Sequence, residues 1–158
     1  MPPPLIVDLE ELDLSQVCYT QERIYDSLPQ RHEFMLLQGI CYADVERGLM
    51  VAFRDIHSED WWFPGHLPAR PLVPGVLLLE MSAQTSAFLT HLRSGSDSFI
   101  AFGGVDECKF RETVTAPSRL YLLCKVLEIR SRRVVSATQA ICNGRLVFEA
   151  KITGMVMH

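Results

Sequence analysis

The strongest constraint on the fold is a long apolar segment that directly follows a proline-rich loop. Prolines occupy positions 64, 68, 71 and 74, and residues 76–94 then contain neither proline nor glycine. Four prolines within eleven residues cannot form a regular helix or a central strand, so we expect a stiff loop there. The next segment predicts a long helix that Gly95 ends. Because its first half is apolar almost all round, we expect this helix to be buried on most sides.

The other segments predict an antiparallel sheet. We expect two strands before the helix, at about 34–43 and 48–56, and about four after it, within 98–110, 119–131, 132–144 and 145–157. Asn143–Gly144 is a strong signal for a hairpin turn. A short helix is expected at 22–28, where Pro29 ends it.

This order of elements predicts an α+β fold in which a strongly curved sheet wraps one buried helix. The chain has 158 residues, of which 48% are hydrophobic, and this suits one ordinary domain better than two. We expect residues 1–20 to be an N-terminal extension and residues 21–158 to form a single domain.

Charge limits the classes of partner. The net charge of −4 argues against general nucleic-acid binding. Residues 1–80 carry 5 basic and 13 acidic side chains, whereas residues 81–158 carry 10 and 6. This asymmetry indicates either an uneven surface composition or a basic patch for an acidic partner. The residues of that patch would be Lys109, Arg111, Arg130, Arg132 and Arg133.

Five cysteines, an odd number without a CxxC pair, fit a reduced cytoplasmic protein better than a disulfide framework or a zinc site. The N-terminus lacks the basic and apolar regions of a secretory signal. The longest apolar run, 72–92, contains Glu80, Gln84 and His91, which is poor composition for a membrane span. We therefore expect a cytoplasmic protein without membrane insertion.

The candidate catalytic pair is His66, in the proline loop, and Glu80, early in the helix. The 14 residues between them allow the loop to fold back, so the two side chains could share a pocket within one chain or across a dimer. The alternative is a purely structural histidine and a carboxylate near a helix start. Gln84 lies four residues after Glu80, where its amide can orient the carboxylate. The helix starts at Pro74–Gly75, and Gly75 allows a ligand to approach its backbone N–H closely.

These groups suit proton abstraction beside a carbonyl, with loss or shift of a neighbouring group. His66 is suited to remove a weakly acidic proton near neutral pH. Glu80 can act as an acid if apolar surroundings favour its protonated form, which the helix N-terminus opposes. The Gly75 N–H can polarise a carbonyl oxygen. His32, His57 and His91 lack comparable context, and we expect no metal site, because the acidic residues near His57 have no second histidine at ligand spacing.

Residues 63–84, FPGHLPARPLVPGVLLLEMSAQ, resemble the signature of the FabZ-type 3-hydroxyacyl-[acyl carrier protein] dehydratases. That signature joins Gly-His, a proline-containing loop, Pro-Gly-Val-Leu, a Glu 14 residues after the His, and Ala-Gln. Residues 104–117, GVDECKFRETVTAP, resemble the family's GVDKCRFRRPVVPGD segment. Residues 24–37, IYDSLPQRHEFMLL, resemble its ILPHRYPFLLVD segment. The resemblance therefore covers nearly the whole chain from Ile24 onwards.

The resemblance implies a hot-dog fold and a homodimer with joined sheets, often a trimer of dimers. Each active-site tunnel is then built from two chains, so His66 of one chain faces Glu80 of the other. The implied substrate is a (3R)-hydroxyacyl chain on the phosphopantetheine arm of acyl carrier protein, an acidic partner, and the product is the trans-2-enoyl thioester. In this picture His66 takes the C2 proton, Glu80 protonates the leaving hydroxyl, Gly75 holds the thioester carbonyl and Gln84 orients Glu80. No metal or organic cofactor is implied, and the further substrate-binding residues are Phe63, Pro74 and Val76.

The chain also departs from the family pattern. Residues 30–33 read Gln-Arg-His-Glu in place of His-Arg-Tyr-Pro, and Trp61 and Trp62 precede the catalytic loop where Pro and Phe are usual. These changes leave acyl-chain length, carrier docking and pathway open, and a divergent paralogue in specialised lipid or polyketide synthesis is one interpretation. The alternative functions are a hot-dog thioesterase and a non-catalytic acyl-binding paralogue.

Overall fold

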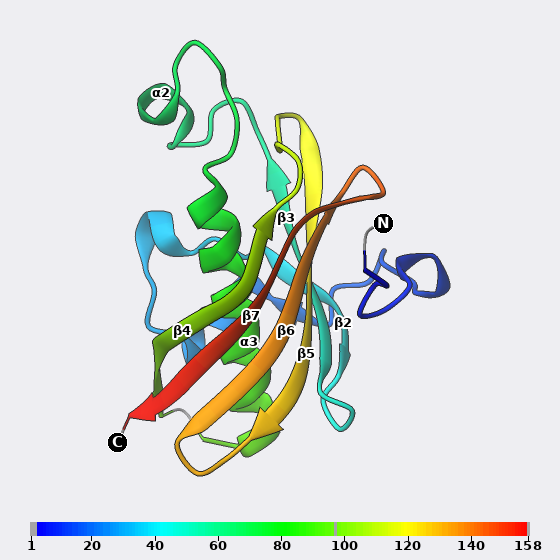
Figure 1. Cartoon of the computed structure of the whole chain (residues 1–158), viewed down its shortest axis with the longest axis vertical. Coiled ribbons are helices and arrows are strands. Elements are labelled where there is room, and N and C mark those ends of the chain that lie inside the picture. The colour runs from blue at the N-terminus through cyan, green and yellow to red at the C-terminus, as the bar shows by residue number, and fades with distance from the viewer. Residues whose placement is uncertain (1–2, 97, 158) are drawn as a thin grey trace.

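The long helix lies in the hollow of a curled sheet, as the sequence predicts (Figure 1). The computed structural model describes residues 3–96 and 98–157, so the first two residues of the expected N-terminal extension lie outside it. Helix α3 (Gly75–Ser94) ends at Gly95, whose φ of 69° is a left-handed conformation that favours glycine. The Gly95 N–H donates to the His91 carbonyl at 2.9 Å and closes the last turn.

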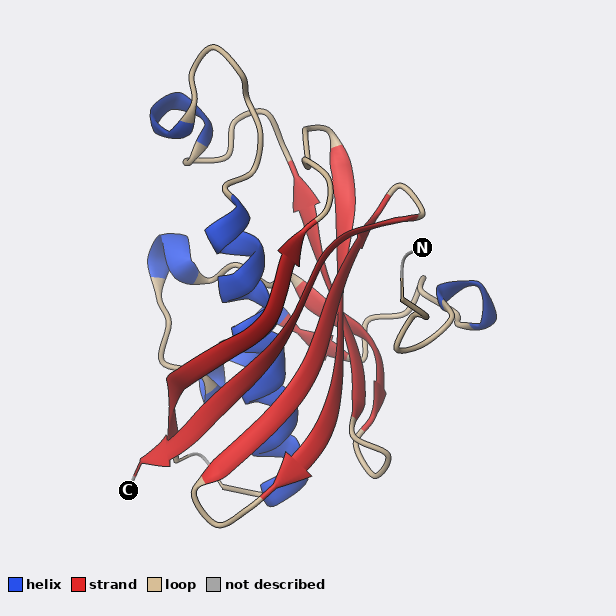
Figure 2. Cartoon of the chain, in the orientation of Figure 1, coloured by secondary structure: helices blue, strands red, loops and turns tan. Residues whose placement is uncertain are grey.

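One seven-stranded sheet, antiparallel throughout, wraps around α3 (Figure 2). Its strand order is β1-β2-β3-β5-β6-β7-β4. The strands are β1 (Tyr19–Thr20), β2 (Gly39–Asp44), β3 (Leu49–Ile56), β4 (Phe99–Phe110), β5 (Ser118–Ile129), β6 (Arg133–Cys142) and β7 (Arg145–Met157). Asn143 and Gly144 join β6 to β7 with φ of 53° and 74°, as a two-residue hairpin turn requires. The α+β hot-dog fold is therefore confirmed.

Two local predictions were wrong. The first strand was expected from about residue 34, but β2 begins at Gly39, because His32–Phe34 form the short 3-10 helix η2. The proline loop was expected to lack regular helix, yet Phe63–His66 form the single turn α2. Pro64 fits there because the first helical positions have no intrahelical partner for a backbone N–H. The predicted short helix is present as α1 (Gln21–Ser27), which the Thr20 side chain caps.

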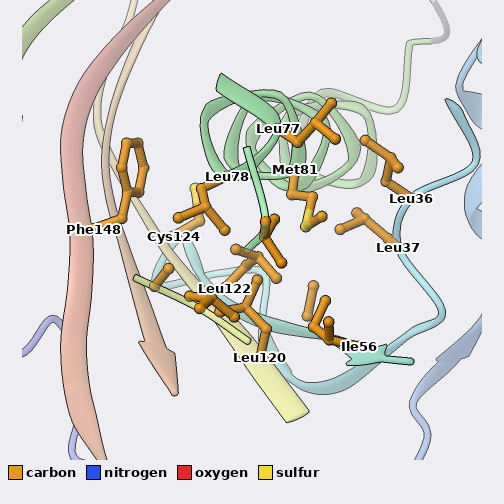
Figure 3. Packing of buried hydrophobic residues seen from close by; sticks show 14 of the residues in the cluster. Leu36, Leu37, Ile56, Leu77, Leu78, Met81, Leu120, Leu122, Cys124 and Phe148 are labelled. Atoms are coloured by element: carbon orange, nitrogen blue, oxygen red, sulfur yellow. The ribbon is translucent and has the colours of Figure 1, made fainter. Parts of the chain in front are cut away.

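The main core lies between α3 and the concave face of the sheet (Figure 3). Leu78 and Met81 of α3 pack in the same cluster as Leu120 and Leu122 of β5. Val76 does not follow the expected burial of the first helical turns, because it is 69% exposed in the single chain. The helix therefore keeps one apolar side open at its N-terminal end.

A second apolar cluster lies on the outer face of the sheet. It contains Val51 of β3 and Leu123 of β5, which alternate along their strands with residues of the main core. The N-terminal segment, with the 3-10 helix η1 (Leu9–Glu11), packs against it through Ile6, Val7, Leu9, Leu12 and Leu14. Gln139 fastens this segment, since its side-chain amide pairs with the Ile6 N–H at 2.7 Å and with the Pro4 carbonyl at 3.0 Å.

Candidate active site

Glu80 lies in the second turn of α3 and is half-buried. The Gln84 side chain, one turn further on, donates from Nε2 to Glu80 Oε1 at 2.9 Å. The same nitrogen donates to the Phe34 carbonyl at 3.0 Å. The structure thus places Gln84 where it orients the Glu80 carboxyl group, as expected from the spacing of four residues.

Tyr25, on α1, completes this network and was missed in the sequence. Its hydroxyl donates to Gln84 Oε1 at 2.6 Å and accepts the Leu37 N–H at 2.8 Å. Burial is the main cause that raises the pKa of Tyr25 well above its usual range, so the phenol stays protonated and keeps donating. The sequence feature that could have revealed Tyr25 is its position between the apolar Ile24 and Leu28 in a short amphipathic helix.

His66 is the last residue of α2 and is exposed in the single chain. Its Nδ1 lies 3.3 Å from the Leu72 carbonyl, which can only accept a hydrogen bond. In the neutral ring the proton therefore resides on Nδ1, and Nε2 keeps a free lone pair. This is the tautomer that a general base needs.

The start of the loop that carries His66 is anchored to the rest of the protein. The buried Trp62 and Phe63 pack into the main core. The Arg54 guanidinium donates to Asp60 at 2.7 Å and lies 5.2 Å from the centre of the Trp62 ring. These contacts fix the start of the loop, whereas residues 64–71 are exposed.

A single chain does not bring His66 and Glu80 into one cavity. Glu80 lines a cavity of about 180 Å³ between α3 and the strands β4 and β7. The His66 loop borders a separate groove of about 580 Å³, lined by Phe63, Arg70 and Leu72 among others. Within residues 3–96 and 98–157, no hydrogen bond or ion pair joins the two side chains.

Gly75 is the first residue of α3, so its N–H has no partner within the helix. A Cβ atom at this position would lie 2.8 Å from the Phe110 ring, and only glycine fits this approach without a shift. Of the other expected substrate-binding residues, Pro74 is buried at the helix start and Phe63 is buried in the core, whereas Val76 is exposed.

The expected basic patch is not one surface. In the strand register, Lys109 of β4 lies opposite Glu149 of β7, whereas Arg133 of β6 lies opposite Met155 of β7. Six residues along β7 separate the two groups by about 20 Å. Arg111 forms an ion pair with Glu149, and Arg130 and Arg133 both pair with Glu128. The interpretation as a single basic patch is therefore wrong and the alternative, an uneven surface composition, fits, because residues that cluster in the sequence lie at opposite ends of the sheet.

Among the described residues, no three His, Cys, Asp or Glu side chains come together in a group that could hold a metal ion. The same part of the chain contains no helix with the length and apolarity needed to cross a membrane.

Comparison with known proteins gives a family match over most of the chain. A family model described as the FabA-like domain matches residues 28–151. The 3-hydroxyacyl-[acyl-carrier-protein] dehydratase FabZ of Protochlamydia amoebophila is 32% identical over 143 residues, which cover 90% of this chain and 88% of the relative. The protein of the same name from Enterococcus faecalis is 34% identical over 139 residues, which cover 87% of this chain and 97% of that relative.

Solved structures share the fold at low identity. The dehydratase heterocomplex ApeI:P from Xenorhabdus doucetiae matches with a TM-score of 0.71 and 15% identity, covering 85% of this chain and 91% of that one. A hypothetical thioesterase from Streptococcus pneumoniae, solved with coenzyme A, matches with a TM-score of 0.55 and 13% identity. The match covers 70% of this chain and 80% of that one. At these identities the structural likeness supports the hot-dog fold alone.

Proposed function

This chain belongs to the FabA-like family, and we propose that His66 and Glu80 are the residues with which it dehydrates 3-hydroxyacyl chains. It is an enzyme of the FabZ type, a 3-hydroxyacyl-[acyl-carrier-protein] dehydratase of fatty acid biosynthesis. The observation that carries the assignment of residues is the Tyr25–Gln84–Glu80 network, which holds a carboxyl group at a fixed place on the wall of an otherwise largely apolar cavity.

In the proposed mechanism, Nε2 of His66 takes the proton from C2 of the (3R)-hydroxyacyl thioester. The electron pair of the broken C–H bond forms the C2–C3 double bond, and the C3–O bond breaks. Glu80 gives its proton to the departing hydroxyl, so the products are the trans-2-enoyl thioester and water. The Gly75 N–H donates to the thioester carbonyl and stabilises the negative charge that develops there.

We propose that the working site forms between two copies of the chain. The edge strand β4 pairs with β7 on one side only among the described strands, and its Phe99 and Phe102 are exposed. Both residues also line the Glu80 cavity, so a partner that docks on β4 would complete that cavity. His66 of one chain then faces Glu80 of the other in a homodimer, and three such dimers can assemble further.

The same assignment leads to proposals for the acyl carrier, the cofactor requirement, the cellular location and the domain bounds. We propose that acyl carrier protein presents the chain on its phosphopantetheine arm, near the exposed Arg70 at the groove beside the His66 loop. Proton transfer by two side chains requires no metal or organic cofactor. The five free cysteines fit a cytoplasmic enzyme. Residues 21–158 would form the catalytic domain, with residues 1–20 as the extension.

The test is turnover of a 3-hydroxyacyl thioester, followed as enoyl absorbance, together with an assay for released thiol. His66→Ala and Glu80→Gln should each lower kcat by a factor on the order of 100 or more, whereas the loop variant His57→Ala should keep full activity. Equal turnover by wild type and both variants would contradict the assignment. Release of free thiol without enoyl formation would indicate a thioesterase instead.

Mixing the two inactive variants tests the shared site. A hybrid dimer of His66→Ala with Glu80→Gln contains one site with both wild-type residues and one site with neither. Random exchange should therefore restore about one quarter of the wild-type activity. If the site lies within one chain, the mixture stays inactive.

A further inference from the structure

Arg54 of β3 donates hydrogen bonds in three directions although its side chain is only 11% exposed. Its Nη2 donates to Asp60 Oδ1 at 2.7 Å, and its Nη1 donates to the Leu36 carbonyl at 3.1 Å. Its Nε donates to the Asp55 carbonyl at 3.2 Å. A guanidinium stays charged and presents its donors in a rigid fork, so these bonds fix the positions of its partners relative to one another.

The first arm of this arrangement leads to Glu80. The carbonyl that Arg54 binds belongs to the Leu36–Leu37 peptide, and the N–H of the same peptide donates to the Tyr25 hydroxyl at 2.8 Å. That hydroxyl donates to Gln84 at 2.6 Å, and Gln84 donates to Glu80 at 2.9 Å. Hydrogen bonds in such a chain polarise and strengthen one another. A continuous chain of hydrogen bonds therefore leads from the guanidinium to the carboxyl group of Glu80.

The second arm leads to the loop that carries His66. Asp60 Oδ2 accepts the His57 N–H at 2.8 Å, and the Asp60 carbonyl accepts the Phe63 N–H at 3.2 Å. Phe63 is the first residue of α2, and His66 is its last. The ion pair between Arg54 and Asp60 therefore holds the turn from which α2 starts.

We propose that Arg54 is a positioning residue for the dehydration, which holds the Glu80 network and the start of the His66 loop against one another. The inference rests on the proposed function, because it takes His66 and Glu80 as the reacting pair. Arg54 bonds to neither residue and acts through the Leu36–Leu37 peptide and through Asp60. In the proposed homodimer, His66 and Glu80 of one chain belong to different sites, so a single Arg54 supports both sites.

Steady-state turnover of a 3-hydroxyacyl thioester by Arg54→Met tests this role, with kcat expressed per folded enzyme from circular dichroism. The substitution removes all the donors of the side chain. Because misplacement of a reacting group by about 1 Å costs a factor on the order of 100, kcat should fall by about 10- to 100-fold while KM changes by less than about twofold. Arg54→Lys keeps the charge and can donate to both arms from one nitrogen, so it should restore kcat to within about fivefold of wild type. A kcat of Arg54→Met within about twofold of wild type would overturn the proposal.

A double-mutant cycle with Tyr25→Phe distinguishes positioning of Glu80 from a structural role alone. If Arg54 acts through Tyr25, the loss of kcat in the double variant should be at least about fivefold smaller than the product of the two single losses. Tyr42→Phe, in the outer apolar cluster, is the matched control, and its effect should multiply with that of Arg54→Met to within about twofold. Simple multiplication in the cycle with Tyr25→Phe as well would show that Arg54 does not act through the network.

Arg54→Met/Asp60→Leu keeps the proposal testable if Arg54→Met does not fold. It replaces the ion pair by two apolar side chains and leaves no unpaired charge, and such a replacement is often neutral for stability. Because both arms lose their anchor, its kcat should fall as far as that of Arg54→Met. Wild-type kcat in this folded double variant would overturn the proposal.

His66→Ala and Glu80→Gln separate this proposal from the proposed function. If both abolish turnover while Arg54→Met keeps wild-type kcat, only the role of Arg54 is rejected. If both keep turnover, the assignment of the reacting pair fails first, and the positioning role that depends on it fails with it.

Discussion

Removal of one oxygen atom from Tyr25 should reduce both stability and catalysis. The hydroxyl makes two hydrogen bonds, to Gln84 Oε1 at 2.6 Å and from the Leu37 N–H at 2.8 Å. In Tyr25→Phe both partners would stay buried, since Gln84 is 2% exposed and Leu37 is fully buried. A buried polar group that loses its partner costs about 1–3 kcal/mol. Two such groups lose their partner, so the free energy of unfolding should fall by about 2–6 kcal/mol.

The effect on catalysis follows from the loss of orientation. Without the phenol, the Gln84 amide can rotate away from Glu80, and the carboxyl group loses its fixed direction. Misplacement of a reacting group by about 1 Å costs a factor on the order of 100. Because Tyr25 acts through Gln84 and does not touch the reacting atoms, kcat should fall by about 10- to 100-fold while KM changes little.

Urea denaturation and steady-state kinetics on the folded enzyme measure the two effects separately. Tyr42→Phe is the matched control, because it deletes the same atom from a half-buried tyrosine that packs against the outer apolar cluster. If Tyr25→Phe is as stable and as active as Tyr42→Phe, the network does not position Glu80 and the reasoning fails. A loss of stability with unchanged kcat would assign Tyr25 a structural role alone.

Two further perturbations test other parts of the structure. Gly75→Ala should lower kcat/KM by at least tenfold, because the new Cβ would lie 2.8 Å from the Phe110 ring, and kinetics equal to those of wild type would refute the close approach. Burial raises the pKa of the Cys124 thiol to about 12. At pH 8 iodoacetamide should therefore alkylate the exposed Cys18 in the native enzyme and should alkylate Cys124 only after unfolding. Peptide mass spectrometry measures both reactions. Rapid native labelling of Cys124 would contradict its burial.

The sequence predicted the architecture well where a pattern was long and local. The helix from Gly75 and its stop at Gly95 follow from an uninterrupted apolar segment and one glycine. The hairpin at Asn143–Gly144 follows from a turn that needs two positive φ angles. The start of β2 and the turn α2 were missed because a single turn of helix leaves no periodicity to read.

The candidate site was predictable only along the helix itself. Glu80 and Gln84 lie one turn apart, and their hydrogen bond is a property of helical spacing. Tyr25 reaches the same network from a separate helix, 59 residues away in the chain from Gln84, and no spacing rule reports such a contact. The two groups of basic residues show the same limit, because neighbours in sequence lie at opposite ends of the sheet.

The polar groups along one face of α3 differ in how completely the chain satisfies them, and this difference separates their roles. Glu80 is held by Gln84, and the Gln84 amide is in turn bound by Tyr25 and the Phe34 carbonyl. These hydrogen bonds restrict the motion of Glu80, which suits a group that must meet a reacting atom. His91, three turns further on, uses one ring nitrogen and leaves the other without a partner among the described residues. A buried group with one unpaired nitrogen lacks the fixed hydrogen bonding that orients Glu80, which separates His91 from the catalytic end of the helix.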